Sequence, residues 1–468
     1  MKNERLVLLY KSTKNAQIAV KSSSGISERR TIHDIIMQGT VWSSLMCTST
    51  MDELGKISYN DPYKYKGVVD VPIMGMVDDL VSVVKCSNKS ISYNATVKTF
   101  MELNRLNLSE TKCNKIHIGD SCDRCIKMNI NNTYLENTNR EKYLGDIIDQ
   151  SGKLDSTINN RVERAWGYYS SIKALLIDLP LGKRRIEAGL RLREAMLING
   201  VLFNSEAWHG LNSTHITKLE KIDHQILRVI TGGHSKVPIE FLYLETGTIP
   251  LRFIISSRRL NYLKIILGRN DHELIKRIYI EQKKAPVKGD WINLVECDFN
   301  LINAEFNEGK IMSLSKHQYK QLVKKGIYSA AFNFLKSESE EHTKVKDILY
   351  KQLQLQSYIK SPELSIDEKI LLFSLRSMTV RNIKANFTSF YKNDILCPLC
   401  NKVEDTQQHL LECDIIMMKI NINTHIKYEH ILGDLDQQVK AVQYIHNILE
   451  IHQDLVDQDP AVSSAVGP

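Results

Sequence analysis

The stretch GMVDDLVSVV, residues 75–84, sets two adjacent carboxylates, Asp78 and Asp79, between an apolar run and a β-branched one. The longer segment YKYKGVVDVPIMGMVDDLVSVV, residues 63–84, reads as short strands around this pair. At a tight hairpin turn, two consecutive carboxylates can both reach one side of a cleft. Two interpretations are open: the pair holds a metal ion, or it only makes a turn, where Asp is common.

The sequence around the Asp pair favours the first interpretation. Upstream, QGTVWSSL (residues 38–45) places Gln38 and Gly39 at the opening of a predicted helix, with Ser43 four residues after the glycine. A glycine there lets the backbone approach a ligand. Downstream, Lys112 lies in a predicted turn before a strand, and YLGDII (residues 143–148) is a predicted short strand with a glycine that leaves room for a neighbour.

This order of motifs resembles the palm of reverse transcriptases, in particular those of non-LTR retrotransposons. The resemblance implies that Asp78 and Asp79 are catalytic and hold Mg²⁺, and that Lys112 protonates the leaving pyrophosphate. The aspartates are preceded by Met76 and Val77, where the family usually has an aromatic residue. The resemblance also implies contacts with the template, the nucleotide and the primer, made by Gln38, Gly39, Ser43, Tyr143, Leu144 and Gly145.

A further aspartate is expected in these polymerases, on a strand well upstream of Gln38. Only 37 residues precede Gln38, and no acid among them stands in the expected Asp-x4-aromatic-Asp setting. A two-metal reaction needs enough carboxylates to hold two metal ions, which together stabilise the attacking and the leaving oxygen. We therefore expect the chain alone not to polymerise. The alternative function is a non-catalytic protein that binds RNA or DNA.

Residues from about 155 to 270 show helical periodicity. In THITKLEKIDHQILRVITGG (residues 214–233), apolar residues recur at helical spacing until Gly232 and Gly233 stop the helix. Together with IEFLYLETGTIPLRFIISSRRLNYL (residues 239–263), this region resembles the thumb of the same elements. Arg258 and Arg259 could lie along a nucleic-acid backbone there, or they could belong to a solvated helix face.

The segment CPLCNKVEDTQQHLLEC contains four potential metal ligands, with the spacing C-x2-C-x8-H-x3-C: Cys397, Cys400, His409 and Cys413. A C-x2-C turn brings two thiolates together. His409 and Cys413, about one helical turn apart, would share a face of a helix. We expect a closed, structural Zn²⁺ site, against the alternative of free thiols beside an unrelated helix. A CCHC zinc knuckle after the thumb is also part of the resemblance.

Composition places the chain among intracellular globular proteins. It has 468 residues, nine cysteines and a formal net charge of +8, and no early apolar stretch is long enough for a signal sequence or a membrane span. We expect a nuclear or cytoplasmic protein in a reducing compartment that tolerates a polyanionic partner. The resemblance implies an RNA template, a DNA primer or target, and dNTPs as partners.

The predicted fold class is α+β. We expect a partial reverse-transcriptase palm, an antiparallel sheet with helices, followed by a mainly α-helical thumb and a C-terminal region with a small zinc knuckle. The predicted boundaries are 1–150 for the palm, 151–285 for the thumb, 286–345 for a connector, 346–395 for a helical region, 396–415 for the knuckle, and 416–468 for the C-terminal helix and tail. A capping box of Ser365 and Glu368 predicts the start of one of these helices.

Overall fold

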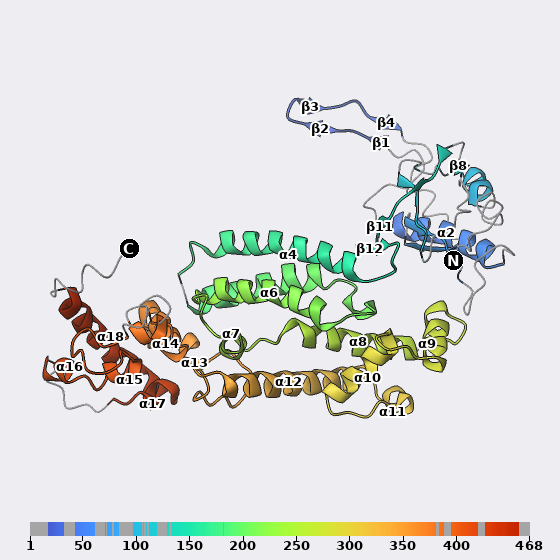
Figure 1. Ribbon diagram of the computed structural model, residues 1–468. Coiled ribbons are helices and arrows are strands. Elements are labelled where there is room, and N and C mark those ends of the chain that lie inside the picture. The colour runs from blue at the N-terminus through green and yellow to red at the C-terminus, as the bar shows by residue number, and fades with distance from the viewer. Residues whose placement is uncertain are drawn as a thin grey trace. The chain divides into compact units, whose positions relative to one another are not determined.

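The computed structural model is mixed α and β, mostly helical, with small sheets of two strands that are mainly antiparallel (Figure 1). The fold therefore fits the α+β class. The residues that the structure describes are 17–31, 43–60, 71, 73–76, 79–83, 97–104, 106, 109, 112–118, 129–130, 133–180, 182–380, 383–387, 395–419 and 426–457. The chain divides into two compact units, Met1–Leu144 and Gly145–Pro468. The finer predicted boundaries stay predictions.

The first unit combines short strands with a helix, α2. Its described elements are β1 (Gln17–Ile18), β2 (Lys21–Ser22), β3 (Gly25–Ile26), β4 (Arg30–Thr31), α2 (Ser43–Asn60), β5 (Met74–Met76), β6 (Asp79–Val81), β7 (Asn114–Lys115), β8 (Asn129–Ile130), β9 (Thr133–Tyr134), β10 (Glu136–Asn137) and β11 (Arg140–Tyr143). Residues 97–103 are also helical. A small core of Leu54, Ile73, Phe100 and Met101 joins α2 to the strand region. The helix predicted within residues 43–55 is thus confirmed.

The second unit is built almost entirely from helices. Its described elements are β12 (Asp146–Asp149), α4 (Asp155–Leu176), α5 (Lys183–Leu192), the π-helix η2 (Arg193–Val201), the 3-10 helix η3 (Ser205–Ala207), α6 (Ser213–Thr231), α7 (Ile239–Thr246), α8 (Leu251–Leu267), α9 (Leu274–Lys284), α10 (Trp291–Leu301), α11 (Glu308–Ser313), α12 (Lys316–Glu341), α13 (Ser357–Lys360), α14 (Ile366–Arg376), the 3-10 helix η4 (Lys384–Phe387), α15 (Gln407–Leu410), α16 (Asp414–Lys419), α17 (Glu429–Leu432) and α18 (Leu435–Asp457).

Local sequence sets the ends of several of these helices. The Asn212 side chain caps α6 by accepting a hydrogen bond from the backbone N–H of His215 at 3.0 Å, and Gly232 ends the helix in the left-handed conformation. The predicted capping box of Ser365 and Glu368 is present at the start of α14. These caps satisfy backbone groups that have no partner within the helix. The predicted helix end at Gly232 and the predicted helix start at Ser365 are confirmed.

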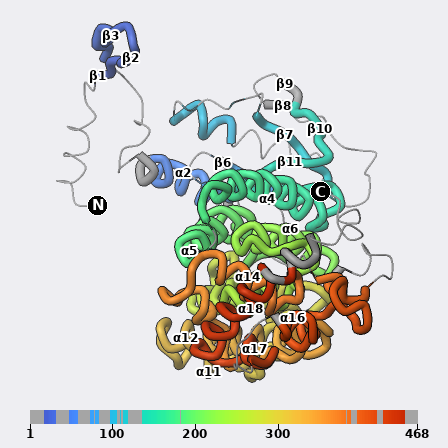
Figure 2. Tube along the Cα trace, turned by 90° about the vertical axis from the view of Figure 1, so that its left-hand side faces the viewer, coloured from blue at the N-terminus to red at the C-terminus, as the bar shows by residue number. Residues whose placement is uncertain are grey.

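The helices of the second unit pack in a stack (Figure 1). Helix α4 lies on α6, α6 contacts α7 and α8, and both of these contact α12. Figure 2 shows α14, α16, α17 and α18 gathered together, and α18 packs against each of the other three. Two hydrophobic clusters fill the unit. The larger runs from Leu154 in front of α4 to Ile448 in α18, and the smaller lies among α8, α9, α10, α11 and α12.

Two pairs of buried charges lie within this stack. The Arg193 guanidinium forms two hydrogen bonds with the Asp223 carboxylate, at 2.6 and 2.7 Å, and the Tyr243 hydroxyl donates to the same carboxylate at 2.8 Å. Arg376 and Glu245 form a second buried pair at 2.8 Å. A buried charge without a partner is costly, so these pairs hold α6, α7 and α14 in fixed positions relative to their neighbours.

Candidate metal centre and the predicted site residues

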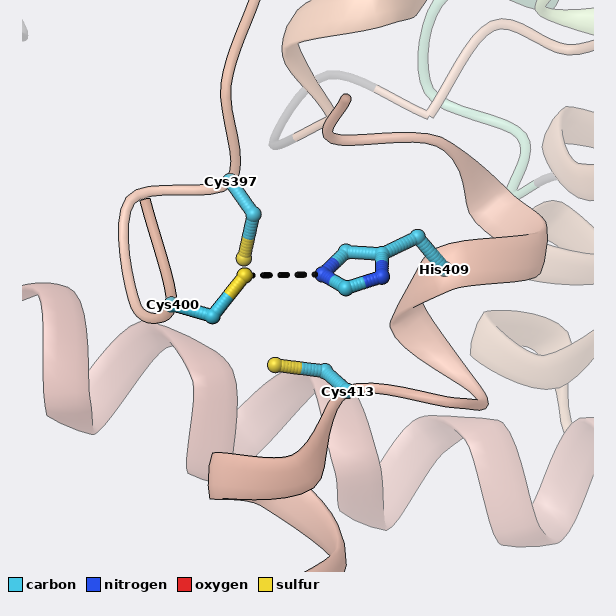
Figure 3. Close-up of side chains that lie close together, drawn as sticks. All are labelled: Cys397, Cys400, His409 and Cys413. Atoms are coloured by element: carbon cyan, nitrogen blue, oxygen red, sulfur yellow. Dashed lines mark hydrogen bonds between the residues drawn. The ribbon is translucent and has the colours of Figure 1, made fainter. Parts of the chain in front are cut away.

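Four side chains of the second unit converge on one point (Figure 3). The ligand atoms of Cys397, Cys400, His409 and Cys413 all lie within 4.8 Å of one another. Cys400 Sγ and His409 Nε2 are 3.3 Å apart. Cys397 and Cys413 are buried, and the other two residues are half-buried. These residues can hold a metal ion, as their spacing in the sequence predicted.

A tight backbone turn presents the two N-terminal cysteines. The backbone N–H of Cys397 donates to the carbonyl of Val403 at 2.8 Å, and that of Asn401 donates to the carbonyl of Cys397 at 2.9 Å. Asn401 takes a positive φ of 51°, which asparagine tolerates better than most residues. The turn therefore brings both thiols to the same side.

The other two ligands come from separate short elements, which corrects one prediction. His409 lies in α15, but this helix ends at Leu410, and Cys413 immediately precedes α16. The sequence predicted one continuous helix through both residues. Instead, the chain turns between the two helices, and Cys413 still reaches His409 and the two other cysteines (Figure 3).

Sequence reasoning missed the residues that support this centre. The Thr406 hydroxyl caps α15 by accepting a hydrogen bond from the His409 backbone N–H at 3.0 Å. The Asp405 carboxylate accepts one from the Lys384 backbone N–H at 2.8 Å. Thr406 could have been found as a threonine three residues ahead of the histidine, which is the spacing of an N-cap. The Asp405 contact joins distant positions and leaves no local signal.

The environment of the two N-terminal thiols differs. Burial raises the pKa of Cys397 to about 12. Backbone hydrogen bonds from Cys400 and Leu399 act in the opposite direction but are the weaker effect. Burial also opposes ionisation of Cys400. The Cys400 thiol also forms hydrogen bonds with the backbone of Lys402 and Val403 and with the His409 side chain. Together these hydrogen bonds outweigh burial and lower the pKa of Cys400 to about 7. Cys400 is thus the thiol that ionises more readily, and the thiolate is the form that binds metal.

The predicted catalytic region lies in the first unit. Strands β5 and β6 form the antiparallel hairpin expected around the Asp pair, with Met76 opposite Asp79. Asp78 lies outside the described residues, and the Asp79 side chain is exposed. Tyr143 lies near Asp79: burial, followed by the negative charge of Asp79, raises the pKa of its hydroxyl. Asp79 and Tyr143 are thus two predicted site residues that interact electrostatically.

Lys112 occupies the turn that the sequence predicted. Its backbone N–H donates to the carbonyl of Ser109 at 3.0 Å, its side chain is exposed, and β7 begins two residues later. Gln38 and Gly39 lie outside the described residues. Ser43 begins α2, and its side chain also lies outside the described part. The catalytic and nucleotide-binding roles of these residues stay predictions.

The structure corrects the prediction of one strand across residues 143–148. Strand β11 ends at Tyr143, Leu144 and Gly145 form a turn, and β12 begins at Asp146. Gly145 has a φ of 91°, a conformation that side chains rarely adopt, so the glycine serves the turn rather than a close strand neighbour. The primer-contacting role of Tyr143, Leu144 and Gly145 remains a prediction.

The two predicted thumb arginines make contacts within the protein. Arg258 is half-buried and donates to the backbone carbonyls of Leu202 and Ile198, the latter at 3.1 Å. Arg259 is buried and forms an ion pair with Asp298 at 2.9 Å. These contacts give both residues a role in helix packing. A contact with nucleic acid stays a prediction, and burial weighs against it for Arg259.

Among the described residues, the Cys and His cluster is the only group of three or more His, Cys, Asp or Glu side chains that could hold a metal ion. Asp79 belongs to no such group among these residues. No helix in the described part is long and apolar enough to cross a membrane. Neither a known protein family nor a curated protein matches this chain.

Proposed function

We propose that this chain derives from the reverse transcriptase of a non-LTR retrotransposon, that it binds RNA or DNA, and that Zn²⁺ holds its C-terminal region together. The observation that carries this proposal is the convergence of Cys397, Cys400, His409 and Cys413. Three cysteines and one histidine form a common ligand set of structural zinc sites. The order of the palm motifs supports the assignment to a reverse transcriptase, and β5 and β6 form the hairpin that this assignment requires.

Zinc fits this ligand set in a structural role. Four protein ligands complete a tetrahedral shell and leave no open position for a reacting water or substrate. When bound, the ion would join the turn that carries Cys397 and Cys400 to the two short helices that follow it. The chain's own contribution is to orient the ligands, through the backbone turn at Asn401 and the Thr406 cap.

Nucleic-acid binding is the function that this scaffold supports best. The chain has a formal net charge of +8, and a basic protein that neutralises phosphates releases counterions. A gel-shift titration of the full chain with labelled RNA and DNA, repeated over a range of salt concentrations, tests this function. We expect retardation at low salt and a logarithm of affinity that falls linearly with the logarithm of salt. An absence of retardation at low salt would reject the function.

Templated DNA synthesis is a second candidate. It is favoured by the place of Asp79 in the β5–β6 hairpin, with Tyr143 nearby. A primer-extension assay with a homopolymer template and Mg²⁺ or Mn²⁺ tests it. Incorporation that is lost in Asp79→Ala and kept in Asp52→Ala, which removes another exposed carboxylate, would support a polymerase. Incorporation that is unaffected by Asp79→Ala would reject the catalytic role of that residue.

A further inference from the structure

Helix α12 carries a row of exposed side chains at four-residue steps: Lys316, Lys320, Lys324 and Tyr328. We call these four residues the α12 lysine row. Residues four apart lie on the same side of a helix, about 6 Å apart along its axis. A neighbouring row, with Tyr319, Val323 and Ile327, is buried in the smaller hydrophobic cluster. The buried row fixes the helix, so the lysine row faces outward.

The lysines of this row have no acidic partner among the described residues. Helix α12 contains no Asp or Glu before Glu338. Three other lysines of the same region do have acidic partners: Lys310 pairs with Glu305 at 3.5 Å, Lys336 with Glu340 at 3.7 Å, and Lys283 with Glu308 at 2.5 Å. The α12 lysine row therefore concentrates positive charge that its protein neighbours do not neutralise.

The row ends on an exposed aromatic ring. Tyr328 keeps 42% of its surface exposed, although it lies in the middle of a packed helix. The Lys324 ammonium lies 5.9 Å from the centre of the Tyr328 ring. Exposed aromatic rings beside positive charge are the combination with which proteins bind single strands, because lysines attract phosphates and rings stack on bases. A duplex offers phosphates but no unstacked base.

We propose that the α12 lysine row binds single-stranded nucleic acid, with the lysines along its phosphates and the Tyr328 ring on a base. The inference rests on the proposed nucleic-acid binding and assigns it to a surface other than the predicted palm and thumb residues. An acidic polypeptide could meet the lysines but would not use the face of the ring.

Fluorescence anisotropy of the full chain with a labelled single-stranded oligonucleotide, measured over a range of salt concentrations, tests the lysines. In the variant Lys320→Gln/Lys324→Gln, we expect the slope of log affinity against log salt to become shallower by about 1.4, since each single-strand phosphate contact contributes about 0.7. The control Lys310→Gln/Lys336→Gln removes the same charge from lysines that already have acidic partners. We expect its slope to match that of the unmodified chain.

Variants of Tyr328 test the stacking contact. We expect Tyr328→Ala to weaken single-strand binding roughly 5- to 150-fold, whereas Tyr328→Phe, which keeps the ring, binds as the unmodified chain does. Binding of a duplex of equal length should not respond to Tyr328→Ala. Both substitutions lie on an exposed helix face, and circular dichroism checks that the helix content is unchanged.

The outcomes separate this inference from the proposed function. If the unmodified chain binds no nucleic acid at low salt, both are wrong. If it binds but the row variant and its control have the same salt slope, only the inference is wrong. A loss of polyglutamate binding in the row variant, with oligonucleotide binding intact, would identify an acidic protein as the partner and also overturn the inference.

Discussion

At the scale of single residues, Glu308 provides the clearest dependence of stability on pH. Its carboxylate accepts hydrogen bonds from Tyr279 Oη and Lys283 Nζ, each at 2.5 Å. Burial raises the pKa of Glu308, but these two contacts and the lysine charges outweigh burial and lower the pKa below its ordinary value of 4.5. A carboxyl group whose pKa is lowered in the folded state stabilises the fold at pH values above its unfolded-state pKa. This stabilisation is lost as the pH falls through the folded-state pKa.

We therefore expect Glu308→Gln to be less stable than the unmodified chain at pH 7, with a difference that shrinks as the pH falls below about 4.5. Urea denaturation at a series of pH values measures this difference. The control is Glu305→Gln, since Glu305 is well exposed and pairs only with Lys310. An exposed pair contributes little, so its difference should be near zero at every pH. An unchanged Glu308→Gln difference between pH 7 and pH 3.5 would contradict the assignment.

Individual residues could be predicted where the signal is local. The helix end at Gly232 and the Ser365–Glu368 capping box follow from neighbouring sequence, and the structure confirms both. The four metal ligands also lie within a short segment. Arg259 was different: its partner Asp298 is 39 residues away, and nothing in the sequence around Arg259 shows that the helices bring the two together. The sequence therefore offered a nucleic-acid contact or a solvated helix face for Arg259, and not a buried ion pair.

At the scale of elements, Gly247 fixes how α7 ends. Its φ is 68°, and a Cβ added there would lie 2.4 Å from backbone atoms of Gln354 and Leu355. The chain returns at this point, because the backbone N–H of Gln356 donates to the carbonyl of Glu245 at 3.1 Å. The glycine thus permits both the left-handed helix end and the close approach of the second segment.

We expect Gly247→Ala to lower the free energy of unfolding by more than Gly210→Ala does. Gly210 has a similar φ of 64°, but a Cβ added there meets nothing within 4 Å. The control therefore reports the backbone cost alone, about 1–2 kcal/mol, and the difference between the variants reports the clash with Gln354 and Leu355. Urea denaturation of both variants measures the two costs. Equal losses of stability in the two variants would show that the backbone at Gln354 and Leu355 shifts to accommodate the added Cβ at no measurable cost.

Helices were easier to predict than the turns between short elements. A long amphipathic pattern carries many residues that agree, as in α6 and α18, whereas a turn depends on one or two positions. The segment TQQHLLEC reads as one helix, yet the helix ends at Leu410, and Cys413 approaches the other ligands from beyond the turn. Residues 143–148 read as one strand, but the positive φ of Leu144 and Gly145 makes them a turn.

At the scale of the whole molecule, the sequence predicted a helical second part but not how its helices share their cores. The larger hydrophobic cluster joins residues from Leu154 to Ile448, and the smaller one joins α8 to α12. Which helices meet depends on contacts between residues far apart in the chain, which periodicity does not encode. Cys397 and Cys413 belong to the larger cluster, so the candidate metal centre forms part of a core that helices from both ends of the unit build.

This arrangement predicts where removal of the metal loosens the chain. Helix α15 has four residues and α16 has six, and helices this short are not stable by themselves. We expect a chelator to increase amide hydrogen exchange in residues 395–419 and in the part of α18 that packs against α16, because the ligands no longer hold these short elements together. Helices α10 and α12 should keep their protection, since their apolar side chains lie mainly in the smaller cluster.

Hydrogen exchange followed by mass spectrometry, together with zinc analysis of the purified protein, measures both parts of this prediction. The variant Cys400→Ser should lose bound zinc and show the same pattern of exchange without a chelator. The control Cys297→Ser changes an exposed cysteine of α10 outside the cluster and should retain zinc. Unchanged zinc content in Cys400→Ser would reject the ligand assignment. Cys400→Ser could also lose zinc and increase hydrogen exchange in α10 as much as in residues 395–419. The effect of the missing ligand would then have spread from the larger hydrophobic cluster to the smaller one, which would show that the two clusters unfold as one unit.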